Sequence, residues 1–408
     1  MMSVRAVYAV VVLTIAGFVT AADAQQFTPA PAQDTIPVIR VSEEGVTFRS
    51  PTGSFLLRLR GYLHQDARFY NDDAQGGTDA FLLRRVRPVF EATSGMFEFK
   101  LMPDFGVGAP LVQDAYVGVN FSPAVRLRAG KYKAPVGLER LVSAIAIRFV
   151  ERAFPTSLVP NRDVGVQLFG EVAGGVLGYA VGVFNGVVDG GSADTDTNDS
   201  KEIDGRLYTS RLVRGLTVGL AGTYGRNSGS VLPSYKTPGQ VDFFTFRTLT
   251  ADGTRSRVIA HGSFYSGTIG VMSEWVRSSE QVRTTTTAGE VNATAWQVSG
   301  GVVLSGEANG ANGVRPRVPL DPANGHWGAV ELVGRVHALD IDDAAFPTFA
   351  DPTRSASAAH AWGAGADWYW NRNVKLVVNY EHTRFDGGAA TGDRPAETII
   401  FTRLQFSY

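Results

Sequence analysis

The sequence predicts an all-β chain that closes into a transmembrane antiparallel barrel of about 16 strands. Three observations favour this fold class. Short segments that alternate apolar and polar residues recur from residue 38 to the end of the chain. Turn-like clusters rich in Gly, Asn, Asp and Ser separate these segments, and 46 of the 408 residues are Gly. Beyond the N-terminus, no run of about 20 apolar residues offers a membrane-spanning helix.

The two-residue period is clearest between Phe55 and Phe69, where odd positions are mostly apolar and even positions are mostly charged. Segments 97–101, 125–128 and 374–381 repeat this pattern. Successive side chains of a strand point to opposite faces, and a barrel turns its apolar face to lipid and its polar face to the lumen. A soluble secreted β protein, which also alternates, is the alternative. The barrel interpretation predicts that four arginines face the lumen: Arg58, Arg60, Arg126 and Arg128.

The two ends of the chain indicate export. An apolar stretch follows Arg5 and ends at Val19, and small residues then stand at Ala22 and Ala24, as a signal peptidase requires. We expect a signal peptide over residues 1–24, a flexible leader over 25–37 and a single outer-membrane barrel domain over 38–408. The amphipathic C-terminal segment ends on Tyr408, which resembles the signal read by the barrel assembly machinery of Gram-negative bacteria. The outer membrane and its lipid are therefore the expected surroundings.

Composition excludes several kinds of chemistry. The chain has no Cys, so it has neither disulfides nor thiolate metal sites nor a cysteine nucleophile. Its 6 His are scattered without metal-ligand spacing, and no G-x-S-x-G motif is present. We therefore expect no metal, no cofactor and no enzymatic activity, with a barrel hydrolase as the alternative. The net charge of −1 predicts no nucleic-acid partner, whereas 32 of the 38 basic residues are Arg, which suits local recognition of oxyanions.

The connection over residues 134–163 concentrates positive charge. It carries Arg140, Arg148, Arg152 and Arg162 against Glu139, Glu151 and Asp163. Folded inside a water-filled barrel, such a loop would focus positive potential at the narrowest point and admit anions. Solvated or ion-paired arginines on the surface are the alternative interpretation.

Several segments carry a resemblance to a known family. Residues 81–92 (FLLRRVRPVFEA), 111–144 and 149–171, which include a GKYKAPVGLER run and FVERAFP, resemble the phosphate-selective porin O and P family. Residues 296–307 and 362–386 are similar to its C-terminal part. The resemblance implies a homotrimer of sixteen-stranded barrels, each with its third extracellular loop folded inward as a basic constriction. It further implies anion-binding or constriction roles for Arg84, Arg85, Asp114, Arg140 and Arg152.

Two details qualify these assignments. Arg84 and Arg85 are neighbours, so both can face the lumen only at a bulge or near a strand end. The chain has Tyr62 where the family has an Arg, and Glu98 where it has a Lys. The sequence thus predicts an outer-membrane porin for passive diffusion of small anions, with inorganic phosphate as the expected permeant. The alternative is a general porin with weak selectivity, or one for polyphosphate or other solutes.

Overall fold

The computed structural model describes residues 36–71, 77–196 and 198–408, and the chain from Pro37 onward forms one compact unit. The predicted signal peptide over residues 1–24 and nearly all of the predicted leader over 25–37 lie outside the described residues. Within the described residues, no helix is both long and apolar enough to cross a bilayer.

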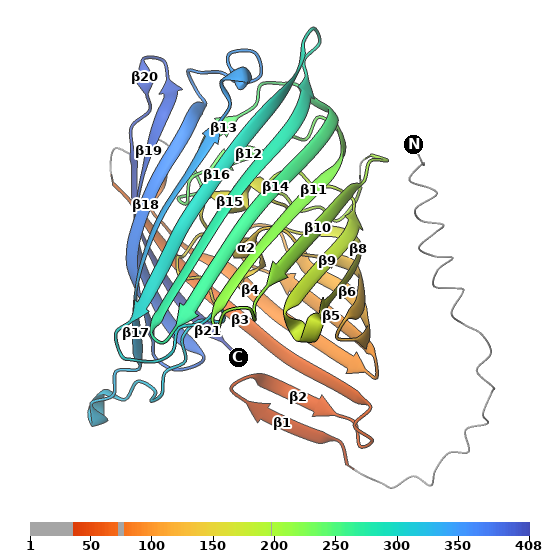
Figure 1. Ribbon diagram of the computed structural model, residues 1–408. Coiled ribbons are helices and arrows are strands. Elements are labelled where there is room, and N and C mark those ends of the chain that lie inside the picture. Colours follow the sequence, from red (N-terminus) through yellow and green to blue (C-terminus); the bar gives the residue numbers. More distant parts are fainter. Residues whose placement is uncertain (1–35, 72–76, 197) are drawn as a thin grey trace, which may run out of the picture. The chain divides into compact units, whose positions relative to one another are not determined.

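Sixteen strands form one closed antiparallel sheet in the described part of the chain, which confirms the predicted barrel (Figure 1). They are β3 (Phe55–Tyr70), β4 (Ala80–Ser94), β5 (Phe97–Asp104), β6 (Leu111–Ser122), β7 (Val125–Tyr132), β8 (Asp163–Val172), β9 (Leu177–Phe184), β10 (Glu202–Thr209), β11 (Leu216–Gly229), β14 (Thr250–Ser266), β15 (Ile269–Arg283), β16 (Ala288–Val303), β17 (Ala329–Ile341), β18 (Ala356–Tyr369), β19 (Val374–Ala389) and β21 (Glu397–Ser407). Each strand pairs with the next one named, and β21 pairs with β3 to close the barrel.

The closing seam continues to the last residue of the chain. Gly61 and Tyr408 exchange two backbone hydrogen bonds, each 3.0 Å long. Where β21 ends, a hairpin of β1 (Val38–Ser42) and β2 (Gly45–Arg49) takes over as the neighbour of β3, with Val46 opposite Leu59. A short β20 (Gly392–Asp393) pairs with the end of β19 at the opposite rim.

Alternation along each strand separates an outer apolar face from an inner polar one. On β15, Val271 and Trp275 are exposed, whereas Glu274 and Val276 are buried inside the barrel. An outer face of this kind suits lipid, because every backbone group of a closed barrel is already hydrogen-bonded.

The two rims differ in their connections. At the rim where β21 ends, the strands are joined by tight turns such as residues 95–96 and 267–268, with one long exception over 304–328 that contains η3 (Pro322–Asn324). Longer loops lie at the other rim, including the one over 342–355 that contains η4 (Asp343–Ala345). A third short 3-10 turn, η2 (Ala173–Gly175), joins β8 to β9.

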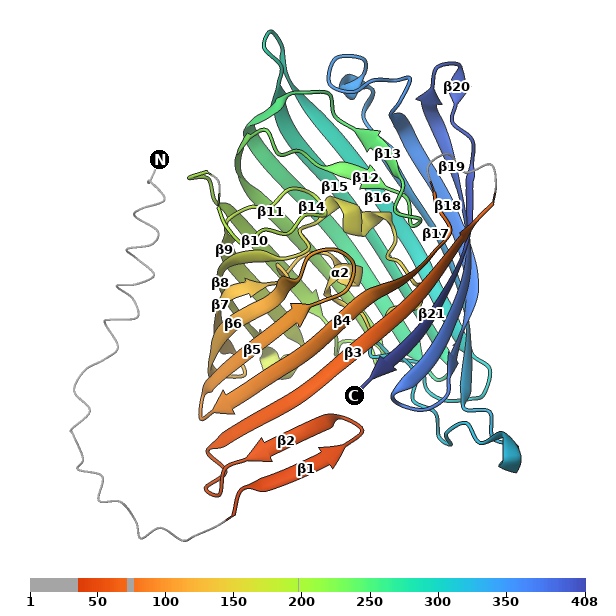
Figure 2. The same cartoon turned by 180° about the vertical axis from the view of Figure 1, so that it is seen from behind.

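The loop between β7 and β8 folds into the barrel. It contains α2 (Leu138–Leu141) and η1 (Phe154–Leu158), and α2 lies within the outline of the barrel in both opposite views (Figures 1 and 2). Gly137 precedes α2 with φ of 80°, and a Cβ there would lie 2.7 Å from Cγ2 of Val159. Only glycine fits this turn without strain, which helps to fix the inward course of the loop.

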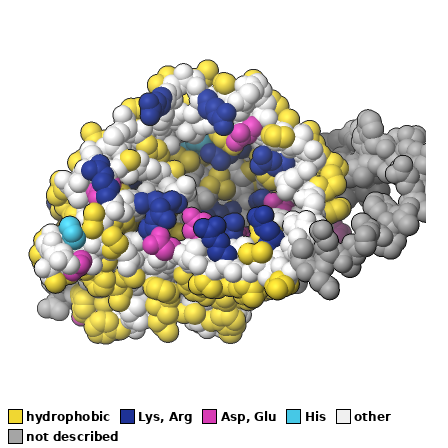
Figure 3. Space-filling model, turned by 90° about the horizontal axis from the view of Figure 1, so that it is seen from below, with side chains coloured by type: hydrophobic (Ala, Val, Ile, Leu, Met, Phe, Trp, Pro, Cys, Tyr) yellow, Lys and Arg dark blue, Asp and Glu magenta, His cyan; other side chains and the backbone are white. Residues whose placement is uncertain are grey.

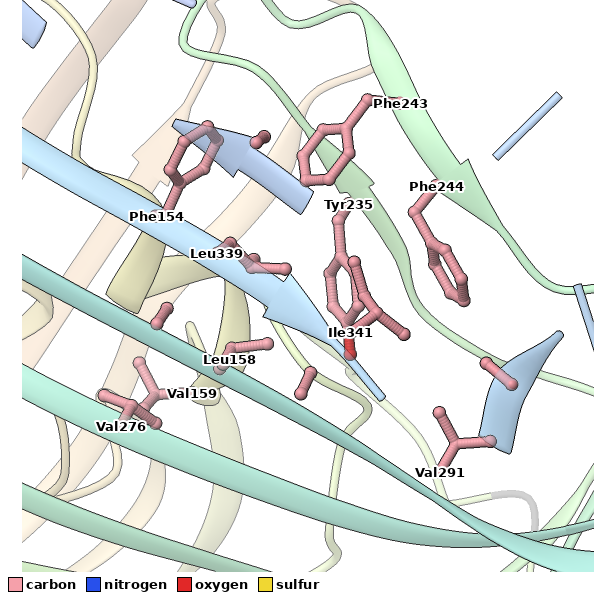
Figure 4. Close-up of a cluster of buried hydrophobic side chains, with 14 of the residues drawn as sticks. Phe154, Leu158, Val159, Tyr235, Phe243, Phe244, Val276, Val291, Leu339 and Ile341 are labelled. Atoms are coloured by element: carbon pink, nitrogen blue, oxygen red, sulfur yellow. The ribbon is translucent and has the colours of Figure 1, made fainter. Parts of the chain in front are cut away.

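A second loop also folds inward, a feature that the sequence pattern did not predict. The connection between β11 and β14 contains a hairpin of β12 (Ser234–Lys236) and β13 (Asp242–Thr245). Its Tyr235, Phe243 and Phe244 are buried together with Phe154 and Leu158 of the first loop (Figure 4). The cluster continues onto wall residues such as Ile259 of β14, Leu339 of β17 and Phe385 of β19. Apolar packing therefore fills the part of the lumen beside these strands.

Candidate functional site

The loop over residues 133–162 crosses the lumen and is anchored to the far wall. Nε of Arg148 donates to Oε1 of Glu331 on β17 at 2.9 Å. Nη1 of Arg335, also on β17, donates to the backbone oxygen of Glu151 at 2.8 Å. Further bonds reach β15, β19 and β21 through Glu274, Asn379 and Gln405. The loop is thereby held as a rigid partition between the two sides of the barrel.

A cavity of about 460 Å³ remains between this loop and the wall formed by β3 to β7. Its lining is strongly cationic. Ten lining residues are basic, namely Arg60, Arg84, Arg85, Arg87, Lys100, Arg128, Lys133, Arg140, Arg152 and Arg162, whereas two are acidic, Asp104 and Asp114. Seen from below, the barrel is hollowed, and Lys and Arg side chains gather around the hollow (Figure 3). All five of the predicted constriction residues therefore line one cavity.

A β-bulge brings Arg84 and Arg85 to this cavity together. The pairing of β3 with β4 runs from His64 opposite Arg85 to Gln65 opposite Leu83, so that Arg84 is the extra residue. Of the two arrangements that would let both side chains face inward, a bulge or a strand end, the bulge is the one present.

Glu151 of the loop holds the arginines of the bulge. Its carboxylate accepts from Nε of Arg84 at 2.6 Å and from Nη2 of Arg68 on β3 at 3.0 Å. Nη2 of Arg85 lies 4.0 Å from the same carboxylate, and Nη1 of Arg85 lies 3.2 Å from Nδ1 of His64. Although burial by itself raises the pKa of Glu151, Arg84 and Arg85 hold it well below its usual value. The carboxylate is therefore ionised and shared among three guanidinium groups.

Arg140 and Arg152 bond only to neutral oxygens. Arg140 donates to the backbone oxygen of Thr156 and, at 3.1 Å, to Oδ1 of Asn161. Arg152 donates to the backbone oxygens of Glu139 at 3.0 Å and Val142 at 2.7 Å. Among the described residues, no carboxylate lies within ion-pair distance of either guanidinium. Within these residues, neither arginine is ion-paired, although the charges of Glu139 and, for Arg140, also Glu274 act on them from farther away.

Burial and the closeness of other cations lower the pKa values of three basic groups in this loop. Burial, followed by the charges of Arg152 and Arg162, lowers the pKa of Arg140 to about 9. Burial also lowers the pKa of Arg152, to about 10. Lys133, which donates to the backbone oxygen of Val142 at 2.9 Å, has its pKa lowered well below the usual value by burial and by Arg152. Both arginines remain charged at neutral pH.

Asp114 is the main acidic group facing these cations. It lies on β6 and accepts from Nε of Arg162 at 3.1 Å, while Nζ of Lys100 lies 3.4 Å from its other oxygen. Two basic residues are therefore tied to the β6 wall by one carboxylate.

The predicted lumen-facing arginines of the strands behave differently from one another. Arg60 pairs with Glu91 at 2.7 Å, and Arg128 pairs with Glu98 at 3.1 Å, both at the edge of the cavity. Arg58 and Arg126 follow the same alternation but are not among the cavity-lining residues. Arg126 instead lies 6.0 Å above the ring of Phe169.

Four basic cavity residues were not among the predicted site residues: Arg87, Lys100, Lys133 and Arg162, of which Arg162 was noted only as a loop arginine. Arg87 lies two positions after Arg85 on β4, so period-two alternation could have found it. Lys100 likewise alternates with apolar residues along β5, so the same pattern could have found it. Tyr62 accepts from Nη1 of Arg87 at 2.9 Å and so helps to hold an arginine at the cavity.

The comparisons with known proteins identify the family. The model of the family "phosphate-selective porin O and P" matches residues 57–408. The chain belongs to this family. It is an outer-membrane porin, and its membrane is that of a Gram-negative bacterium. A comparison with curated proteins gave no match.

Solved structures of other outer-membrane proteins share the fold of the porin. The channel DcaP of Acinetobacter baumannii is 10% identical with a TM-score of 0.59, covering 88% of the porin and 99% of that chain. An anion-selective porin from Comamonas acidovorans is 12% identical with a TM-score of 0.56, covering 87% and 100%. The trimer form of OmpT of Vibrio cholerae is 11% identical with a TM-score of 0.55, again covering 87% and 100%.

In the described part of the porin, no group of acidic and histidine side chains is arranged to hold a metal ion.

Proposed function

We propose that the porin passes small inorganic anions by diffusion through the cavity between its inward loop and the β3–β7 wall, with inorganic phosphate as the permeant. The observation that carries this proposal is the imbalance of the lining, where ten basic residues face two acidic ones. Low-dielectric walls strengthen such a field, which raises the local concentration of anions and repels cations.

The roles proposed for individual residues follow from their partners. Arg140 and Arg152 are the main anion-binding groups, because they lack carboxylate partners and line the cavity. Arg84 and Arg85 form a second step on the opposite wall, and Asp114 shapes the lining by holding Arg162 and Lys100. Conduction needs several weak sites, so that an anion captured at one step can leave for the next.

Two further elements complete the proposal. We propose a homotrimer, because OmpT of Vibrio cholerae, which shares the fold, has a trimer form. We also propose that the assembly machinery reads the C-terminal strand, whose Tyr408 lies at the closing seam beside Gly61.

A general porin with weak selectivity, or one for polyphosphate or other solutes, is the second candidate. The ion pairs Arg60–Glu91 and Arg128–Glu98 favour it, since they neutralise charge on the strand walls. Current block distinguishes the two. Chloride current through the porin in a planar bilayer should be blocked by phosphate below about 1 mM if phosphate binds in the passage. An unaffected chloride current would leave a general anion porin, and preferential block by polyphosphate would favour the longer anion.

A further inference from the structure

Glu151 occupies an unusual position in the loop. The residue is 5% exposed and does not line the cavity, yet its carboxylate contacts Arg84 and Arg85, which do. Within the described part of the chain, it is also the only carboxylate within ion-pair distance of the bulge arginines. The negative charge of Glu151 therefore lies next to two arginines that line the cavity and would meet a permeating anion.

The contacts of Glu151 span the barrel. The carboxylate accepts hydrogen bonds from Arg68 on β3 and Arg84 on β4. The backbone oxygen accepts one from Arg335 on β17. Arg335 is itself held by Glu381 of β19 at 2.9 Å, so that end of the bridge is fixed. The side chain of Arg84 is 25% exposed, and Arg84 lines the cavity.

Because the guanidinium of Arg84 is bound through Nε and Nη2, its orientation is fixed by Glu151. A two-point contact of this kind restricts a planar guanidinium far more than a single bond does. The same contact offsets the charge of Arg84, and Arg85 feels the carboxylate from 4.0 Å. Glu151 therefore fixes the position of Arg84 and offsets part of the positive charge of Arg84 and Arg85.

We propose that Glu151 is a positioning residue and internal counter-ion that sets the strength of anion selectivity by offsetting Arg84 and Arg85. This inference rests on the proposed passage between the loop and the β3–β7 wall. It predicts that the porin is less anion-selective than its arginines would allow, since a carboxylate competes with the permeating anion for them.

The test is the reversal potential of the full-length porin in a planar bilayer under a KCl gradient. Glu151→Gln keeps the shape and one acceptor oxygen but removes the charge. We expect the anion-to-cation permeability ratio to rise about 3-fold at low salt, as one unpaired charge at several ångströms in a wet site produces. The rise should shrink toward 1 M salt, where screening acts within about 3 Å. A purely structural role would not give this salt dependence.

Three variants control the measurement. Glu290→Gln removes the same charge from the exposed face of β16 and should leave the ratio unchanged. Glu151→Asp keeps the charge and should keep the ratio near its original value, which maintains the test if the glutamine variant folds poorly. Arg84→Gln combined with Glu151→Gln restores the local charge and should return the ratio toward the original.

An unchanged or lowered ratio in Glu151→Gln, or a raised ratio in Glu151→Asp, would overturn the counter-ion role. Failure of the proposed function is a different result, because it would appear as a lack of anion preference in the unmodified porin. In that case the shift between Glu151→Gln and the unmodified porin could still be measured and would report on Glu151 alone.

Discussion

The two sides of the barrel interior deal with buried charge in opposite ways. Beside β15 to β19, the lumen is packed with apolar side chains, and Arg335 is 4% exposed with Glu381 at 2.9 Å. His337 shares that carboxylate at 2.6 Å. Beside β3 to β7 a cavity is left open, and Arg140 and Arg152 bond only to neutral oxygens.

This difference indicates where water and ions belong. A charge removed from water is tolerated only when a partner replaces its hydration, as Glu381 does for Arg335. Arginines without such a partner need solvent or a mobile counter-ion. The unpaired loop arginines therefore mark the passage, which they share with paired but partly exposed arginines such as Arg84. Arg335, which is paired and almost fully buried, belongs to the structural wall.

The largest expected effect comes from breaking the packed side. Glu381→Ala leaves Arg335 buried without its carboxylate and should lower the free energy of unfolding by about 3–5 kcal/mol. Denaturant unfolding in detergent, followed by tryptophan fluorescence, measures this loss. Glu43→Ala breaks the exposed pair with Arg372 and should cost less than about 1 kcal/mol. Equal losses in the two variants would contradict the distinction between paired burial and surface pairing.

The next effect tests the apolar core that closes the rest of the lumen. Phe243→Ala should lower the free energy of unfolding by about 3 kcal/mol, because Phe243 is 1% exposed and packs near Phe154 and Phe385. The reversal potential should stay unchanged, since Phe243 does not line the cavity. Phe81→Ala on the outer face is the control for stability. A large change of selectivity in Phe243→Ala would mean that ions pass through the apolar side.

A smaller effect concerns pH. The pKa of Arg140 lies at about 9, so its guanidinium is charged below that pH and loses its charge as the pH rises through it. Anion preference should decline as the pH rises toward about 10, and Lys133, whose pKa burial lowers well below its usual value, adds to this decline. Reversal potentials across this range check the prediction. Arg140→Gln should show a weaker decline, and an equal decline in that variant would assign the titration to another group.

The smallest effect is expected for Arg58→Gln. Arg58 lies on the inner face of β3 but outside the cavity lining, so its field is largely screened. The permeability ratio should change by less than about 2-fold. A change as large as that of a loop arginine would extend the selective region toward the rim where the turns lie.

Much of the fold was predictable because the lipid imposes a simple rule on each strand. Alternation over Phe55–Phe69 located β3, and the amphipathic end at Tyr408 located β21. The barrel closes between these two strands, as a chain in lipid requires. The bulge at Arg84 was likewise one of two arrangements, together with a strand end, that could place both neighbouring arginines inside.

The rest depends on contacts between residues far apart in the chain. Glu151 meets Arg84 across 67 positions and Arg68 across 83, and no local pattern reports such pairing. The inward hairpin of β12 and β13 could have been suspected from Phe243 and Phe244, which are unusual in an exposed loop. The packing of this hairpin against η1 could not have been predicted from sequence, because it depends on the course of another loop.

The most direct test of the account compares the porin with its Arg140→Gln/Arg152→Gln variant. The reversal potential is measured for both in a planar bilayer under the same KCl gradient. Unpaired loop arginines beside the cavity predict anion preference in the unmodified porin and loss of most of that preference in the variant. Cation preference in the unmodified porin, or unchanged anion preference in the variant, would contradict the claim that these arginines select the permeating ion.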